Sequence, residues 1–476
     1  MKRLTILLLL VLIFVPMSLL AQDSPKKAKN VILMIGDGMG FNQHLIGSYW
    51  RHGELGRIPC DSFPFHCAAT TFAAKGKNIE VPQHYAGYDP RAFWNGPTGM
   101  NASGNIAATT DSAAAGAALN TGIKTFNGGL GIDASGNPVE LAADVAIAAG
   151  KSVGAITTVP LTHATPAAVY ARSMSRSSFT EIMEQSEKMT VLMGGGHPCF
   201  DAYGKPLAYD KFNYNYIGGK DIWEKITSPD GYYGFKFIDR AENFDQLAQG
   251  KNLPSKVLGV IRMPDAIPPV DGTPTSGHAS PENVEKVLGK FDTSEIPTLS
   301  TMSLAALNVL AQNENGFYLM VEGGAIDYAS HANNTLQVAF EHTGFSKAID
   351  TVVQWVEKNS SWEETVLIVT ADHETGFAWG QDSWIDKNGD GKFDLKDDEF
   401  VEYKPVVNEG SGKVPGVQFM TGGHTNSLVP VWGIGPGIEE LEESVYGVDE
   451  EAAKCWGFSG KYIDNTDIGI FLKSKM

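Results

Sequence analysis

One segment of the chain combines two carboxylates and an imidazole at a spacing suited to holding a cation. Glu322 directly follows an apolar run at 317–321, Asp327 lies five residues after Glu322, and His331 lies four residues beyond Asp327. The i, i+4 spacing places Asp327 and His331 on one face of a helical turn, so both side chains can reach the same ion. Carboxylate and imidazole groups are ligands that zinc accepts.

Two further segments repeat this arrangement of polar residues after an apolar run. Asp37 follows the run 31–35, and Asp372 and His373 follow the run 366–369. Ligands delivered repeatedly at strand ends are what a hydrolase with several metal ions requires. We therefore expect a multi-metal site that assembles from distant parts of the chain.

Ser112 is the candidate nucleophile. It stands at the start of a predicted helix of small residues over 111–119. A helix N-terminus offers free N–H groups and a favourable dipole to a phosphate. No histidine lies nearby in sequence to act as a base, so activation would come from a metal that lowers the pKa of the hydroxyl. Taken alone, Asp111 and Ser112 before an Ala-rich run are typical of a helix N-cap.

Apolar runs alternate along the chain with helix-like stretches, and these are the elements that must position the candidate site residues. The runs are 31–35, 153–158, 191–193, 317–321, 366–370 and 429–434, and the helix candidates include 111–119, 140–149, 304–312 and 335–357. Continuous apolar strands favour a sheet that is covered on both faces. We predict an α/β fold, a three-layer sandwich with a central, mostly parallel sheet flanked by helices.

The candidate ligands span most of the chain, so separate domains would divide the site. We predict one α/β domain over 22–476, with lid- or crown-like insertions at about 75–104, 198–295 and 381–420. These segments are rich in Gly, aromatic, Pro or acidic residues, and such segments usually lie over a sheet edge.

The N-terminus predicts a secretory signal over residues 1–21. Lys2 and Arg3 precede a nearly continuous apolar stretch at 4–20, and Ala21 offers a small residue for cleavage. The alternative is an uncleaved membrane anchor, since the stretch is almost long enough to span a bilayer. Cleavage predicts a periplasmic or secreted protein without stable membrane insertion.

The net charge restricts the kinds of partner that the protein is expected to bind. Removing residues 1–21 takes away two basic residues, so the net charge moves from −18 to −20. This excess argues against nucleic acid as a steady partner, whereas a small anionic substrate remains compatible with local metal charge.

Disulfides are allowed in an exported chain, but the spacing of the cysteines does not identify the pairs. They are Cys60, Cys67, Cys199 and Cys455, of which the first two are nearest in sequence.

The chain resembles an alkaline phosphatase from about residue 31 to residue 435. The resemblance rests on six segments in the family's order: 35–40 (IGDGMG), 111–114 (DSAA), 163–168 (HATPAA), 322–331 (EGGAIDYASH), 370–373 (TADH) and 422–425 (GGHT). Any one of these segments is modest evidence, but six in order are strong.

The resemblance implies a role for each matching residue. Ser112 would be the phosphorylated nucleophile, and Arg176 would grip the non-bridging oxygens of the substrate. One zinc ion would be held by Asp327, His331 and His424, a second by Asp37, Asp372 and His373, and a magnesium ion by Asp37, Thr165 and Glu322. The implied activity is hydrolysis of small phosphomonoesters through a phosphoserine, and the resemblance leaves a homodimer open.

Two positions depart from the pattern of some bacterial relatives. His163 and Tyr328 stand where those relatives have an Asp and a Lys around the magnesium and the phosphate. Imidazole suits a softer metal, so His163 favours zinc over magnesium in the third site. Tyr328 removes a cation near the phosphate, which is expected to weaken product binding.

Residues 386–397 fit a twelve-residue calcium loop. The proposed ligands are Asp386, Asn388, Asp390, Lys392 through its carbonyl, and Asp397, which replaces the usual Glu at position twelve. The alternative is an acidic surface turn. Calcium would stabilise an insertion between two of the zinc ligands and would take no part in catalysis.

Two other functions compete with phosphomonoester hydrolysis. The first alternative is another enzyme with the same metal framework, such as a phosphodiesterase, sulfatase or phosphomutase. A sulfatase would need a Cys-x-Pro-x-Arg motif or its serine form at the nucleophile, which Ser112 and its neighbours lack. The second is a non-catalytic, calcium-dependent binding protein, but structural zinc sites favour closed, Cys-rich ligand sets.

Overall fold

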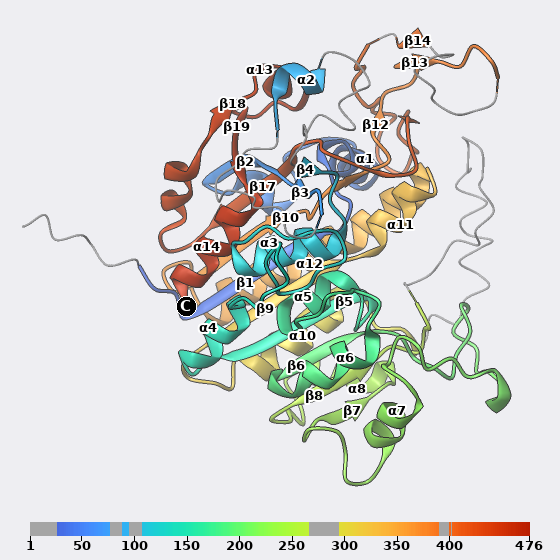
Figure 1. Cartoon of the computed structure of the whole chain (residues 1–476), viewed down its shortest axis with the longest axis vertical. Helices are drawn as coiled ribbons and strands as arrows, with labels where there is room; N and C mark the ends of the chain where they lie inside the picture. The colour runs from blue at the N-terminus through green and yellow to red at the C-terminus, as the bar shows by residue number, and fades with distance from the viewer. Residues whose placement is uncertain (1–25, 77–87, 95–106, 266–294, 390–398, 401) are drawn as a thin grey trace, which may run out of the picture.

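The computed structural model describes residues 26–76, 88–94, 107–265, 295–389, 399–400 and 402–476 (Figure 1). The predicted signal at 1–21 lies outside these residues. So do Asp390, Lys392 and Asp397 of the predicted calcium loop, and parts of all three predicted insertions.

The centre of the molecule is a large mixed sheet. In the described residues it has eleven strands, in the order β18 (Gly447–Val448), β19 (Lys461–Asp464), β2 (Phe65–Thr70), β17 (Val429–Ile434), β10 (Thr365–Thr370), β1 (Asn30–Gly36), β9 (Phe317–Gly323), β5 (Ser152–Pro160), β6 (Val191–Gly195), β8 (Val257–Val260) and β7 (Lys236–Ile238). Pairing is parallel from β10 through β1 to β7, whereas β17 runs antiparallel to both of its neighbours. Each of the six predicted apolar runs lies in one of these strands.

Helices cover both faces of the sheet, and two adjacent residues of β9 show this directly. The ring of Phe317 contacts Trp355, whereas the hydroxyl of Tyr318 donates to the Asn120 side chain at 2.7 Å. Successive strand residues point to opposite faces, so the helix that carries Trp355 and the helix that carries Asn120 lie on opposite sides of the sheet. One layer contains α1 (Phe41–His52), α8 (Ala241–Ala248), α10 (Leu299–Leu310) and α12 (Thr335–Asn359), and the other α3 (Ser112–Thr121), α4 (Ala142–Ala148), α5 (Ala164–Tyr170) and α14 (Asn465–Lys475) (Figure 1). The predicted three-layer α/β sandwich is therefore present.

Part of the predicted insertion at 198–295 belongs to the sheet itself. Strand β8 pairs in parallel with β6, and β7 pairs in parallel with β8. Helix α8 connects β7, which is the edge strand, to β8, and α7 (Lys220–Thr227) precedes them. The expectation that this whole stretch lies over the sheet edge is wrong for these elements, because short strands of three and four residues give a weak apolar signal.

Small two-stranded ribbons extend beyond the sheet. They are β3 (Ala73–Ala74) with β4 (Ala107–Ala108), β11 (Glu374–Thr375) with β16 (His424–Thr425), β12 (Ala378–Trp379) with β15 (Gln418–Phe419), and β13 (Trp384–Ile385) with β14 (Glu399–Phe400). In the second of these ribbons Thr375 lies opposite His424. The other α-helices of the described residues are α2 (Pro90–Trp94), α6 (Phe179–Glu184), α11 (Ala325–His331) and α13 (Glu450–Trp456).

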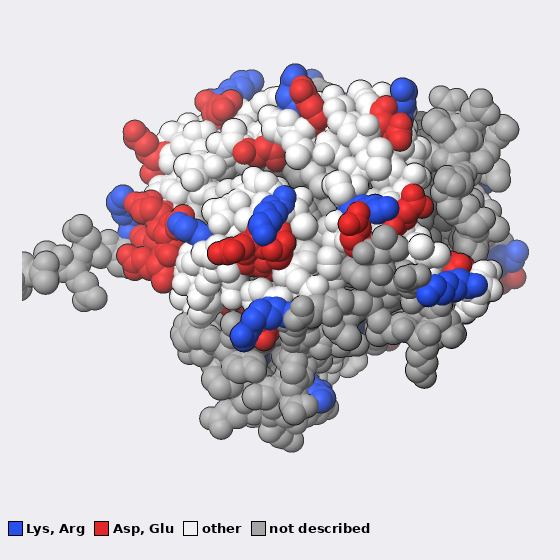
Figure 2. All heavy atoms as spheres, turned by 90° about the horizontal axis from the view of Figure 1, so that it is seen from above, with Lys and Arg blue, Asp and Glu red and all other residues white. Residues whose placement is uncertain are grey.

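On the face shown in Figure 2, the basic side chains of the described residues are interspersed with acidic ones. No helix of the described residues is long and apolar enough to cross a membrane. All four cysteines are free, so the nearest pair in sequence, Cys60 and Cys67, forms no disulfide although both side chains are buried.

Candidate active site

Four neighbouring strands deliver polar side chains to one edge of the sheet. Asp37 follows β1, Glu322 lies near the end of β9, Asp372 follows β10, and Thr165 lies in α5 just after β5. These four strands are parallel and adjacent in the order β10, β1, β9, β5, so their carboxyl ends meet. All four side chains are buried.

The first candidate metal group consists of Asp327, His331 and His424, which offer ligand atoms within 4.8 Å of one another. His331 Nδ1 lies 2.6 Å from the carbonyl oxygen of Gly422, and His424 Nδ1 lies 2.8 Å from that of Thr110. Each Nδ1 therefore carries the proton and donates it, which leaves both Nε2 atoms facing inward. These two Nε2 atoms are 3.1 Å apart. Burial opposes protonation of His331, but the hydrogen bond between its Nε2 and Asp327 raises the pKa of the ring to about 9. The pair of Nε2 atoms beside Asp327 therefore favours a positive charge, which is either this proton or a bound cation that replaces it.

The second group consists of Asp37, Asp372 and His373, and it is completely buried. His373 Nε2 lies 3.5 Å from Asp37 Oδ1 and 3.2 Å from Asp372 Oδ2. The other oxygen of Asp372 accepts hydrogen bonds from the backbone N–H groups of Gly38 and His373. The fixed oxygen orients the carboxylate, so its partner oxygen is directed at the centre of the group.

The two candidate metal groups are in direct contact with each other. The ring of His373 stacks on the ring of His424, with centroids 3.6 Å apart and an interplanar angle of 22°. One ring comes from each group, so two bound ions would be near neighbours. This is the arrangement that a two-metal phosphoryl-transfer site needs.

Oxygen ligands gather beside the second group. Thr165 Oγ1 donates to Asp37 Oδ2 at 3.3 Å, and the hydroxyl of Thr157 donates to Glu322. Glu322 also lies within hydrogen-bonding reach of Asp37 and Thr165, so the structure brings together the three residues that the resemblance assigns to magnesium. Thr157 was not predicted. It lies inside the apolar run 153–158, where a strand residue gives no sequence signal of a site.

Ser112 is the first residue of α3 and lies beside the second group. Its Oγ is 3.3 Å from His373 Nε2. Asp111 caps the helix by accepting from the backbone N–H of Ala114 at 3.0 Å. The N-cap interpretation of Asp111 is therefore correct, and it coexists with the placement of Ser112 at the candidate metal groups.

Arg176 lies in the loop between α5 and α6, and its side chain points toward the start of α3, where Ser112 lies. Its Nη1 donates to Asp111 Oδ2 at 3.1 Å, and its Nη2 lies 3.3 Å from His163 Nε2. Its backbone N–H donates to the carbonyl oxygen of Gly128. Both the loop and the guanidinium are thereby fixed near the start of α3.

His163 and Tyr328 form a polar contact at the edge of the site. The hydroxyl of Tyr328 lies 3.4 Å from His163 Nε2 and donates to Asp265 Oδ1 at 3.3 Å. Asp265 was not predicted as a site residue, because nothing near it in sequence indicates that it reaches α11. Burial and the neighbouring Arg176 lower the pKa of His163 to about 3, so the ring is neutral at pH 7.

The carboxylates of the site have unusual pKa values because they are buried together. Burial raises the pKa of Asp372 to about 8, with the charge of Asp327 adding to it, and burial raises that of Glu322 to about 7. Burial and Asp372 also raise the pKa of Asp37 well above its ordinary range. Asp327 differs: burial opposes its ionisation, but the hydrogen bond with His331 and the neighbouring histidines hold its pKa low.

The donor set fits divalent cations. Within the described part of the chain, Asp37 Oδ1, Asp372 Oδ2 and Glu322 Oε1 are buried and accept no hydrogen bond. A buried carboxylate oxygen without a partner is costly unless a cation compensates it. Nitrogen and oxygen ligands in the first two groups suit zinc, and the oxygen ligands around Glu322 suit magnesium.

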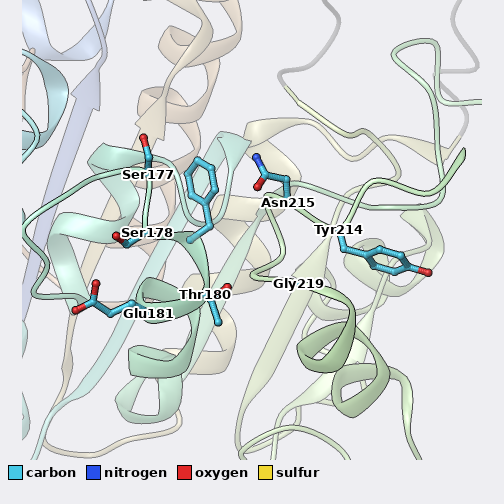
Figure 3. Close-up of a pocket in the computed structure, with 8 residues that line it drawn as sticks. Ser177, Ser178, Thr180, Glu181, Tyr214, Asn215 and Gly219 are labelled. Carbon is cyan, nitrogen blue, oxygen red and sulfur yellow. The ribbon is translucent and has the colours of Figure 1, made fainter.

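A surface hollow of about 510 Å³ adjoins the loop that carries Arg176. It is lined by Ser177, Ser178, Phe179, Thr180, Glu181, Tyr214, Asn215 and Gly219. In Figure 3 the side chains of Glu181 and Tyr214 point away from each other on opposite sides, so these two polar groups do not converge on the hollow. The hollow therefore gives no support to a second binding site.

Metal-ligating groups at the carboxyl edge of a parallel sheet are typical of layered α/β metallohydrolases. A family model described as alkaline phosphatase matches residues 97–390, which is more than half of the 476 residues. The chain belongs to the alkaline phosphatase family.

Individual relatives agree with this membership. Alkaline phosphatase 4 of Bacillus subtilis is 32% identical over 358 residues, covering 73% of this chain and 62% of that protein. The match therefore spans less than two thirds of that relative. The alkaline phosphatase of Escherichia coli is 27% identical over 379 residues, covering 74% of this chain and 71% of that protein.

Solved structures support the fold. The alkaline phosphatase from the Antarctic bacterium TAB5 matches with a TM-score of 0.58 and 22% identity, covering 94% of this chain and 99% of that chain. The enzyme of Thermus thermophilus matches with a TM-score of 0.59 and 20% identity, covering 96% and 93%. At this identity the likeness concerns the α/β sandwich alone.

Proposed function

We propose that the protein is a metal-dependent phosphate monoester hydrolase that acts through a phosphoserine at Ser112 and releases inorganic phosphate. Family membership supports the reaction class. The observation that carries the proposal is the position of Ser112 Oγ, 3.3 Å from His373 Nε2. That ring belongs to one candidate metal group and stacks on a ring of the other.

Each proposed ion has a defined set of ligands. Asp327, His331 and His424 would hold one zinc ion, Asp37, Asp372 and His373 a second, and Asp37, Thr165 and Glu322 a magnesium or zinc ion, with His163 and Tyr328 beside this third site. Divalent ions bound at these positions would supply Lewis-acid stabilisation of the attacking and leaving oxygens and would lower the pKa of the serine hydroxyl.

The side chains of the protein bind and orient the substrate. Arg176 can donate two parallel hydrogen bonds to non-bridging phosphate oxygens, and Asp111 holds its guanidinium in place. The N-terminus of the ten-residue helix α3 favours the negative charge of the phosphate. Ser112 Oγ loses its proton and forms a bond to phosphorus while the ester P–O bond breaks, and the departing oxygen takes up a proton so that the alcohol leaves.

Hydrolysis of the phosphoserine completes the reaction. Water adds to phosphorus, the bond to Ser112 Oγ breaks, and inorganic phosphate departs as the serine hydroxyl regains a proton. Each step inverts the configuration at phosphorus, so the overall result is retention. Retention distinguishes this path from direct attack of water, which would invert once.

Variants at Ser112 test the proposal. Ser112→Ala should abolish hydrolysis of an aryl phosphomonoester while zinc stays bound, and a matched change at the exposed Ser135, Ser135→Ala, should leave the rate unchanged. Unaltered turnover in Ser112→Ala would refute the nucleophile. Faster cleavage of an aryl phosphodiester than of the monoester would favour the phosphodiesterase alternative. Retained zinc without any esterase activity in the wild type would favour the non-catalytic binding protein.

Location and calcium are separate proposals. The apolar stretch 4–20 and Ala21 support export to the periplasm or the medium. Calcium at 386–397 rests on the motif alone. Of its proposed ligands, Asp386 and Asn388 lie in the described residues, and Asp386 Oδ1 already accepts from the backbone N–H of Gly389 at 2.6 Å.

A further inference from the structure

One buried hydroxyl touches both candidate metal groups. Thr375 Oγ1 lies 2.6 Å from Asp327 Oδ1, in the first group, and 3.2 Å from His373 Nδ1, in the second. The side chain of Thr375 is completely buried. It therefore connects a carboxylate of one group with the imidazole of the other.

The hydroxyl of Thr375 donates its single proton to Asp327. A carboxylate such as Asp327 can only accept, and a distance of 2.6 Å between two oxygens marks a short, charge-assisted hydrogen bond. Thr375 must therefore donate to Asp327 and accept from His373. His373 can satisfy this contact only with its proton on Nδ1. The tautomer follows from the partners of both atoms.

This tautomer determines what the opposite side of the ring can do. With the proton on Nδ1, Nε2 of His373 carries a lone pair, and it faces Asp37, Asp372 and Ser112 Oγ. A ring nitrogen must offer a lone pair to bind a metal ion. Thr375 therefore keeps His373 in the form that binds an ion in the second group.

The backbone fixes Thr375 in this position. It lies in β11, paired with His424 of β16, so the hydroxyl and a ligand of the first group belong to one ribbon. Gly376 follows with φ of +90°, and a Cβ there would lie 2.7 Å from a ring carbon of Phe419. Glycine thus permits a tight turn directly after Thr375.

We propose that Thr375 is a positioning residue that couples the two metal groups, holding His373 as the Nδ1–H tautomer through its own bond to Asp327. The inference rests on the proposed function, because it presupposes that both groups bind ions. Loss of a hydrogen-bond partner behind a metal ligand typically weakens metal binding by about 10- to 100-fold. The hydroxyl, and not the methyl group, should carry this effect.

Zinc titration of the full-length, chelator-treated protein tests the coupling. Thr375→Val keeps the shape but removes the hydroxyl, and it should weaken zinc binding at the second group by about 10- to 100-fold. Thr375→Ser keeps the hydroxyl and should restore wild-type affinity. The matched control is Thr425→Val in the same ribbon, because that hydroxyl donates to Glu374, which belongs to neither group. This control should bind zinc as the wild type does.

Three results would overturn the inference. These are wild-type zinc affinity in Thr375→Val, a failure of Thr375→Ser to restore binding, and an equal loss of affinity in Thr425→Val. A thermal melt of each metal-free variant separates a folding defect from a binding defect, since Thr375→Val should melt close to wild type. If the wild type itself bound no zinc at these groups, the proposed function would fail instead, which is a different outcome.

Discussion

Arg176 Nη1 donates to Asp111 Oδ2 at 3.1 Å, and Asp111 Oδ1 accepts from the backbone at the start of the helix that begins with Ser112. One carboxylate therefore fixes two groups that come from different parts of the chain. It also accepts from the backbone N–H of Gly128. The placement of Arg176, the proposed phosphate-binding group, relative to Ser112, the proposed nucleophile, therefore depends on Asp111.

Two substitutions at Asp111 should separate its roles. Asp111→Ala removes both the cap and the ion pair, and loss of an N-cap typically costs about 1 kcal/mol of stability. Asp111→Asn keeps a capping oxygen but removes the charge that faces Arg176. Both variants should raise KM for an aryl phosphate several-fold, and only Asp111→Ala should lower Tm. Unchanged KM in both variants would show that the pair does not position Arg176.

The metal-free protein should lose stability as the pH rises. Asp372 and Glu322 have pKa values of about 8 and 7 in the folded chain, above their ordinary values of 3.8 and 4.5. The folded state therefore retains protons that the unfolded chain has already released, and the resulting stability disappears between about pH 4 and pH 8.

Thermal melts across that range check the sign of the effect. After chelation, Tm should fall from pH 6 to pH 9, and Asp372→Asn should flatten the decline because the amide does not titrate. Zinc affinity should rise over the same interval, since the ion competes with these protons. A metal-free Tm that stays level or increases would contradict the assignment.

His66 should make the protein sensitive to acid. Burial, reinforced by the charge of His44, lowers the pKa of His66 to about 4 from an ordinary value of 6.5. Its ring stacks on Trp432 with centroids 5.4 Å apart. The unfolded chain takes up a proton first, so stability is present above pH 6.5 and is lost as the pH falls toward 4. His66→Phe keeps a ring, and urea unfolding at several pH values should show a shallower loss; an identical slope would exclude this histidine.

Lys124 should be essential for stability. Its Nζ lies 3.0 Å from Asp464 Oδ2 and 2.7 Å from Asn465 Oδ1, and it is buried. Breaking a buried ion pair by removing one partner typically costs about 3–5 kcal/mol. Lys124→Met should therefore strongly lower the free energy of unfolding. Lys454→Met, in the exposed pair with Glu451, should change the free energy of unfolding far less, because exposed ion pairs contribute little to stability; equal effects of the two substitutions would contradict the interpretation.

The strands that carry the site could be predicted from sequence because their apolar runs are continuous and long. Runs such as 31–35 and 366–370 lie within β1 and β10, and parallel pairing brings Asp37 and Asp372 to one edge. The run 429–434 was also predicted, but its antiparallel direction was not. An apolar run indicates burial, and it contains no information on strand direction.

The contacts that orient the ligands could not be predicted in the same way. Thr375 lies two residues after His373, yet its partner Asp327 comes from α11, and Asp265 reaches Tyr328 from beyond β8. Such hydrogen bonds depend on the packing of distant segments. A single threonine or aspartate has too many ordinary roles for its type to reveal this one.

The most direct test is a crystal structure of the zinc-loaded protein with anomalous diffraction measured at the zinc edge. We predict one zinc peak among Asp327, His331 and His424 and a second among Asp37, Asp372 and His373, both beside Ser112 Oγ. Absence of either peak, or zinc bound only at other surface residues, would contradict it.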